Sequence, residues 1–80
     1  MLYHVHVDTP SCIAIDPEIM RGTPVFKGTR VPVKILFDYL AGGDSIDEFL
    51  LDFPGVGRDQ VASVLDAAGE LVERQVADSA

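Results

Sequence analysis

The sequence predicts a mainly helical domain with three helices and a short β-hairpin at its N-terminal end. After Pro32, apolar residues recur at helical spacing in three consecutive segments, whereas the residues before it alternate or are interrupted by proline and glycine. The chain has 80 residues, 48% of them apolar and 24% charged, which suffices for one small folded domain. We therefore expect a single domain over residues 1–80. Residues 1–31 would be extended, and residues 32–75 would form a homeodomain-like or winged helix-turn-helix core.

The extended segment contains three short apolar runs, at residues 2–7, 12–15 and 25–27. Residues 2–7 alternate as a strand does, the run at 12–15 has β-branched character, and residues 25–27 are typical of a brief strand. Between the last two runs, Pro17, Gly22 and Pro24 exclude a long helix. Asp16 can still cap a single helical turn over residues 17–20.

The segment that follows the third run predicts the turn into the first helix. Gly28 permits a positive φ, and Pro32 holds the residue before it extended. The Thr29 hydroxyl can bond the local backbone. Arg30 has two possible roles, as a clamp on its own fold or as a contact to phosphate.

Each helix is predicted by one apolar stripe. The stripes are Val33, Leu36, Phe37 and Leu40; Ile46, Phe49, Leu50 and Phe53; and Val61, Val64, Leu65, Ala68, Leu71 and Val72. Pro32 suits the first turn of the first helix, and Ser45 with Glu48 matches a capping box at the start of the second. The third helix begins near Arg58 and runs to about Gln75, and the tail beyond it is expected to fray.

Charge is distributed unevenly along the chain. The formal net charge is −7, and residues 1–40 carry as many bases as acids, so the whole excess belongs to residues 41–80. An acidic protein binds nucleic acid only through a local basic patch, and residues 21–34 contain four bases and no acid. A helix-turn-helix domain reads DNA with the start of its last helix, whose solvent face is acidic here. Weak to moderate binding of operator DNA is therefore expected, through Lys27, Arg30, Lys34, Arg58, Gln60 and Ser63.

Residues 15–33 read I-D-P-E-I-M-R-G-T-P-V-F-K-G-T-R-V-P-V and resemble the hallmark segment of the domain of unknown function 433 family, G-x-P-x-(hydrophobic)-x-G-T-R-(I/V)-P-V. The resemblance covers residues 12–70 and includes the Ser45–Glu48 helix start and the Phe53-Pro54 pair. It implies a helix-turn-helix antitoxin of VapB type. Such an antitoxin dimerises, neutralises a PIN-like ribonuclease toxin and represses its own operon.

The resemblance directs attention to the end of the third helix as the surface that would hold the toxin. PIN-like nucleases bind divalent metal with carboxylates, which attract a guanidinium, and Arg74 is the only base after Arg58. Nearby acids would pair with the basic rim that binds RNA. The candidate partner-binding residues are Asp66, Glu70, Glu73 and Arg74. The alternative for Arg74 is an ordinary solvated helix end in which it pairs with Glu70.

Other features indicate a binding protein. No arrangement of residues resembles an active site, so no enzymatic activity and no cofactor are expected. His4 and His6 lack the further ligands of a metal site, and the lone Cys12 is expected to pack as a small apolar residue. The single cysteine, and the lack of a signal sequence or an apolar run of bilayer length, favour the cytoplasm.

A homodimer is expected because a core this small is marginal. Tyr3, Val5 and Val7 would form an apolar strand face that takes part in the contact. A second function class stays open, namely a protein-interaction or dimerisation module that does not bind DNA itself. A gene for a PIN-like protein beside this one would favour the antitoxin.

Overall fold

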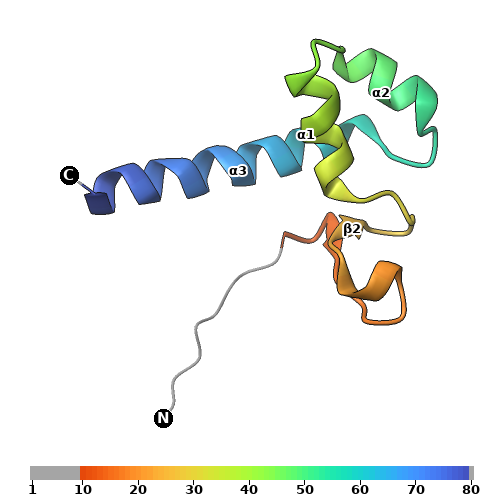
Figure 1. The fold of residues 1–80 in the computed structure, drawn as a ribbon, viewed down its shortest axis with the longest axis horizontal. Helices are drawn as coiled ribbons and strands as arrows, with labels where there is room; N and C mark the ends of the chain where they lie inside the picture. The colour runs from red at the N-terminus through yellow and green to blue at the C-terminus, as the bar shows by residue number, and fades with distance from the viewer. Residues whose placement is uncertain (1–9, 80) are drawn as a thin grey trace.

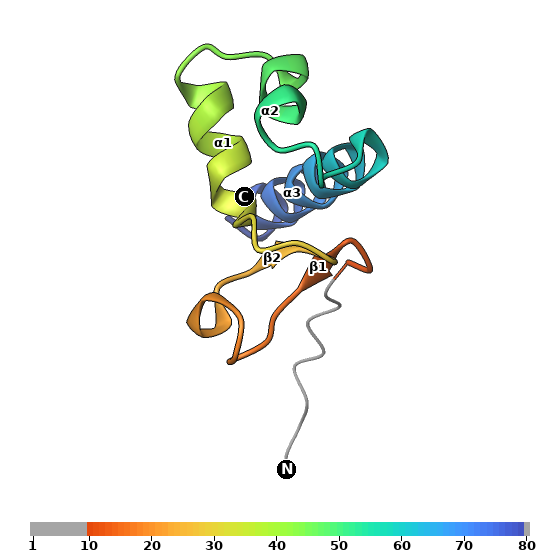
Figure 2. The same cartoon turned by 90° about the vertical axis from the view of Figure 1, so that its right-hand side faces the viewer.

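The computed structural model describes residues 10–79, which form a two-stranded antiparallel hairpin followed by three α-helices (Figure 1). The elements are β1 (Ile13–Ala14), β2 (Val25–Phe26), α1 (Val33–Ala41), α2 (Ile46–Asp52) and α3 (Arg58–Ser79). The predicted class, mainly helical with a short hairpin, is confirmed. α1 and α2 lie on one side of the start of α3, the hairpin lies on the other side, and the rest of α3 projects away (Figure 1, Figure 2).

The hairpin pairs Ile13 with Phe26 and Ala14 with Val25. The Lys27 N–H also donates to the Cys12 carbonyl at 2.8 Å, so the two strands of the hairpin stay side by side for one residue beyond the ladder. The apolar runs at 12–15 and 25–27 thus each supply a strand, although each strand is shorter than its run. Cys12 is buried in the core, as predicted for a small apolar side chain.

The loop between the strands contains a left-handed turn. The single turn predicted after Asp16 forms but is shorter than expected: the Ile19 N–H donates to the Asp16 carbonyl at 2.9 Å, and the Asp16 carboxylate accepts from the Glu18 N–H at 2.9 Å. A separate 3-10 turn follows at Met20–Gly22. Met20 and Arg21 have φ of 51° and 56°, an arrangement that costs L-residues about 1–2 kcal/mol each.

The core forms where the hairpin meets α1, α2 and the first half of α3. Its buried members are Cys12, Phe26, Val33, Leu36, Phe49, Val56, Val61 and Val64. Phe49 is fully buried, and its ring centroid lies 5.8, 5.4 and 5.1 Å from those of Phe26, Tyr39 and Phe53. Aromatic pairs of this kind stabilise by about 0.5–1.5 kcal/mol beyond burial, so Phe49 is the centre of the core.

The starts of α1 and α2 follow the sequence closely. The Glu48 N–H donates to the Ser45 hydroxyl at 3.1 Å, and the Ser45 N–H donates to the Glu48 carboxylate at 2.9 Å, so the predicted capping box is confirmed. Pro32 is the residue before the first turn of α1 rather than a member of it. Phe37, predicted to be buried, is 38% exposed, because it lines an open groove beside α3 and is not part of the core cluster.

α3 departs from the prediction in its second half. The helix continues to Ser79, so the tail predicted to fray from Val76 onward is helical through that residue. Val61 and Val64 are buried as expected, but Leu71 and Val72 are 57% and 61% exposed, so their predicted burial is wrong. The reason is length: α3 is about 33 Å long, whereas α1 and α2 are about 14 and 10 Å and reach only its first half.

Three predictions concern residues outside the described range 10–79: the strand at 2–7, the His4 and His6 pair, and the dimer contact through Tyr3, Val5 and Val7. Within the described range, no helix combines the length and the apolar character needed to cross a lipid bilayer.

Candidate functional site

The G-T-R-V-P-V segment forms a tight turn that is held by one side chain. The Thr29 hydroxyl donates to the Phe26 carbonyl at 2.8 Å and accepts from the Val31 N–H at 3.0 Å. Gly28 has φ of 81°, which confirms the predicted need for glycine. The Arg30 side chain has no hydrogen bond or ion pair to any described residue, so Thr29 rather than Arg30 is the clamp.

Lys27 and Arg30 are therefore displayed on this turn with their charged ends exposed. The third predicted base, Lys34, lies one turn into α1 and pairs with Asp38 at 2.9 Å. Both members of that pair are exposed, so the bond is weak and can be exchanged for a phosphate. The turn thus presents two bases without a partner among residues 10–79, beside one that has a partner.

The candidates at the start of α3 are engaged within the fold. The Arg58 guanidinium donates to the Asp47 carboxylate of α2. The Gln60 side chain accepts from the Gly57 N–H at 2.9 Å and donates to the Lys27 carbonyl at 3.2 Å. Gln60 therefore ties the start of α3 to the turn that carries Lys27 and Arg30, which we call the basic turn. Gln60 thus lies beside Lys27, but its side-chain amide is already hydrogen-bonded and has little capacity left to contact the edge of a DNA base. Ser63 is exposed one turn further along.

The predicted partner-binding residues lie together on the distal half of α3, defined here as residues 66–79. Asp66, Glu70 and Glu73 are all exposed and form an acidic stripe. Arg74 is exposed beside them and forms no ion pair with any described residue, so its predicted pairing with Glu70 is absent. Nothing in the rest of residues 10–79 covers these side chains.

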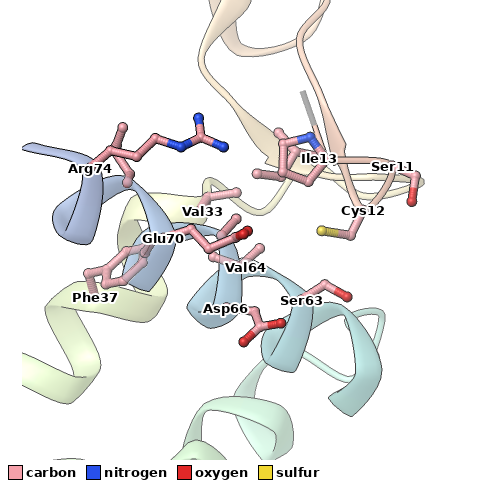
Figure 3. Close-up of a pocket in the computed structure, with 14 residues that line it drawn as sticks. Ser11, Cys12, Ile13, Val33, Phe37, Ser63, Val64, Asp66, Glu70 and Arg74 are labelled. Atoms are coloured by element: carbon pink, nitrogen blue, oxygen red, sulfur yellow. The ribbon is translucent and has the colours of Figure 1, made fainter. Parts of the chain in front are cut away.

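A groove of about 880 Å³ runs along one flank of α3 (Figure 3). Its floor is apolar, with Cys12 and Ile13 from the hairpin side, Val33 and Phe37 from α1, and Val64 from α3. Its edge is charged, since Asp66, Glu70 and Arg74 line it from the distal half of α3. Figure 3 shows Arg74 reaching from α3 over the groove toward the hairpin. An apolar floor with a charged edge is typical of a surface that receives another chain.

An apolar surface that shares Ala68 and Leu71 with the groove continues the core along α3. We call Ala68, Leu71, Val72 and Val76 the apolar stripe; the last three are 57%, 61% and 65% exposed. At about 100° per residue, this stripe lies opposite the acidic stripe. The sequence contained the stripe, but its spacing could not indicate that the chain itself leaves it uncovered.

A polar contact between α1 and α2 was also not predicted from the sequence. The Tyr39 hydroxyl of α1 donates to the Asp52 carboxylate at the end of α2 at 2.6 Å. This hydrogen bond, with burial as the second cause, raises the pKa of Tyr39 above its ordinary value of 10.0. The pair joins two residues of different helices that are thirteen positions apart in the sequence, and no local spacing rule would have found it.

The turn, the first half of α3 and part of the groove fall inside one recognisable segment. A family model described as "Protein of unknown function (DUF433)" matches residues 13–67. The chain belongs to the DUF433 family. The family segment begins at β1 and ends at Ala67, so the apolar stripe lies beyond it.

Two known proteins resemble the chain in addition to the family model. The uncharacterized protein y4eO of Sinorhizobium fredii (strain NBRC 101917 / NGR234) is 34% identical over 65 residues, which are 79% of this chain and 29% of that protein. The chain thus spans less than a third of that relative. A crystal structure of a DUF433 member from Anabaena variabilis ATCC 29413 matches with a TM-score of 0.62 at 26% identity, over 82% of this chain and 68% of that one.

Proposed function

We propose that this DUF433 protein acts by binding and is the antitoxin of a toxin–antitoxin pair, which neutralises a PIN-like ribonuclease through the acidic stripe of α3. The observation that carries the proposal is the exposure of Asp66, Glu70 and Glu73 on a helix half that the rest of the described chain leaves uncovered. The family resemblance supplies the class of partner.

The chemistry of the two surfaces is complementary. A ribonuclease binds the phosphates of its substrate on a basic surface, and a row of carboxylates along a helix can take the place of those phosphates. A PIN-like nuclease also holds its metal ion with carboxylates. The Arg74 guanidinium, which has no ion pair among residues 10–79, can form charge-assisted hydrogen bonds to that cluster. The acidic stripe would thus block the RNA-binding surface of the nuclease, and the Arg74 guanidinium would block its metal site.

The test measures inhibition of the PIN-like ribonuclease encoded beside this chain's gene. The double reversal Glu70→Lys with Glu73→Lys is expected to weaken inhibition on the order of tenfold or more, because like charges would then face each other across the contact. The matched control Glu18→Lys with Asp44→Lys makes the same change in net charge on exposed loops and should inhibit as the wild type does.

Arg74→Gln, added to the Glu70 and Glu73 reversals, is expected to weaken inhibition further. Circular dichroism checks that the fold is unaltered. If no such nuclease gene exists, or if the Glu70 and Glu73 reversals inhibit as well as wild type, the proposal fails.

A second function, binding of operator DNA, is favoured by the exposed bases of the basic turn. Lys27→Glu and Arg30→Glu are each expected to weaken binding to all DNA sequences and to reduce the dependence on salt by about one phosphate contact. Lys34→Ala should have a smaller effect, because Asp38 already holds its ammonium. A promoter fragment that does not shift at low salt, with the nuclease present, would exclude this function.

A further inference from the structure

The groove beside α3 has an apolar part that the proposed function does not use. That function accounts for the acidic stripe and for Arg74 at its edge. Phe37 is 38% exposed and Leu71 is 57% exposed, and both line the groove outside the core cluster. The rest of the floor belongs to side chains of the core, such as Val33 and Val64. Apolar surface in a hollow of this kind marks a place where another molecule packs.

The groove and the acidic stripe are neighbouring parts of one surface. Asp66 and Glu70 belong to the stripe and also line the groove, whereas Glu73 lies outside the groove. At about 100° per residue, Ala67 and Arg74 lie between the acidic stripe and the apolar stripe. A partner that pairs with the acidic stripe therefore reaches the groove, and one molecule can occupy both.

We propose that the groove receives an amphipathic helix of the partner, whose apolar face packs on the floor and whose basic edge pairs with Asp66 and Glu70. The ribonuclease is the partner of the proposed function, on which this inference rests. The inserted helix lies along α3, because the groove follows α3 from Ser63 to Arg74, a length of about 16 Å or three helical turns. Its bases are four residues apart, which matches the spacing of the two acids.

The shape of the groove favours a helix over an extended segment. An extended chain needs a strand edge for its backbone N–H and C=O groups, and β1 offers two residues, Ile13–Ala14. A helix satisfies its own backbone and can press apolar side chains onto an apolar floor. The small side chains of Ala67 and Ala68 line the groove from α3 and allow another helix to approach closely.

The apolar and the acidic parts of this surface act on different steps of binding. Exposed charges steer the encounter, so the acidic stripe sets the association rate and its dependence on salt. Apolar anchors act once the partner is seated, so the groove sets the dissociation rate. Phe37 is the aromatic side chain that lines the groove, and aromatic side chains are common anchors of interfaces.

The experiment measures the association and dissociation rates of the complex with the nuclease by surface plasmon resonance at two salt concentrations. Phe37→Gln should raise the dissociation rate about tenfold or more and change the association rate by less than about twofold. Leu71→Gln should act in the same direction. Both side chains lie outside the core cluster, so circular dichroism should show an intact fold. Leu51→Gln is the matched control, 80% exposed on α2, and should bind as the wild type does.

Photo-crosslinking identifies the inserted element. Phe37 and Leu71 are replaced, one at a time, by p-benzoylphenylalanine, and the crosslinked residues of the nuclease are mapped by mass spectrometry. Both positions should crosslink to one apolar helix face of the nuclease, at residues three, four or seven apart. The same replacement at Leu51 should give no crosslink. Crosslinks to a strand or a loop of the nuclease, or none from the groove, would overturn the proposal.

Glu73→Lys separates the failure of this proposal from the failure of the proposed function. It changes the acidic stripe outside the groove, so it should lower the association rate severalfold and leave the dissociation rate nearly unchanged. If Glu73→Lys acts in this way but both groove variants dissociate as the wild type does, the inserted helix is excluded and the proposed function stands.

A synthetic helix tests the groove without the nuclease. The probe is a peptide of about five turns with one leucine face and arginines four residues apart along its edge. It should shift the nuclear magnetic resonance signals of Phe37 and Leu71, and the same peptide with glutamate in place of arginine should not. A wild type that binds this probe but no nuclease would place the failure in the proposed function alone. A wild type that binds neither would overturn both.

Discussion

The two halves of α3 carry the same apolar pattern and have opposite environments. In the first half, Val61 is 1% exposed and packs into the core with Val64; in the second, Val72 is 61% exposed and is not part of the core. The difference shows that a periodic stripe specifies a face to be buried and not the chain that buries it.

The largest effect should come from breaking the packed side. Phe49→Ala removes a fully buried ring with three aromatic neighbours and is expected to lower the free energy of unfolding by about 3–5 kcal/mol. Urea denaturation followed by circular dichroism measures this. Leu51→Ala, on the same short helix but 80% exposed, should change the free energy by less than about 0.5 kcal/mol. Equal effects would show that α2 does not pack as described.

The sharpest contrast is between two valines of one helix. Val61→Ala should cost about 2 kcal/mol, since it removes buried methyl groups and leaves a cavity. Val72→Ala should change stability by less than about 0.5 kcal/mol when measured in dilute protein. If a second copy covers this face, the second cost should rise in concentrated protein, because dimerisation would then stabilise the folded chain by mass action. A Val72→Ala cost that is large and independent of concentration would show that the chain covers its own stripe.

A smaller effect is expected at Gly69, in the interior of α3. No other part of the described chain lies within 4 Å of the position that a Cβ would occupy. Gly69→Ala should therefore raise stability by about 1 kcal/mol through helix propensity. Gly28→Ala is the opposite control, because its φ of 81° strains any L side chain, and it should lower the melting temperature where Gly69→Ala raises it.

The smallest expected effect is on the pH dependence of the free energy of unfolding. It arises between α1 and α2 and does not involve α3. The hydrogen bond to Asp52 raises the pKa of Tyr39, so the folded chain holds this proton more tightly than the unfolded chain does. The resulting stability is fully present below the unfolded value of 10.0 and is lost as pH rises through the higher folded value. Tyr39→Phe should flatten the decline in stability above pH 10.0, and Asp52→Asn should do the same. An unchanged pH profile in both variants would contradict this account.

Local rules predicted the local structure well. Ser45 and Glu48 are three residues apart and cap one helix, and Gly28 with Thr29 forms one turn, so their chemistry could be predicted from neighbours alone. The left-handed Met20–Gly22 turn could not, because closure of the hairpin around it overrides the preference of methionine and arginine for negative φ.

The candidate site was predicted less fully. The acidic stripe follows from helical spacing, and all of its members are exposed as expected. The ion pair of Arg58 with Asp47 and the contact between Tyr39 and Asp52 depend on how α1, α2 and α3 come together. Spacing within one helix carries no information about such contacts, and the same limit explains the wrong burial of Leu71 and Val72.

The uncovered distal half of α3 also bears on how long each molecule survives. A helix segment with few tertiary contacts opens at a lower free energy than the core, and proteases act on segments that open. Arg74 is the only lysine or arginine beyond Arg58, so a trypsin-like enzyme has one place to cut in this half. If a second copy covers the segment, dilution exposes it, and turnover becomes faster as the protein becomes scarce. The length of one helix would then tie the lifetime of the chain to its abundance.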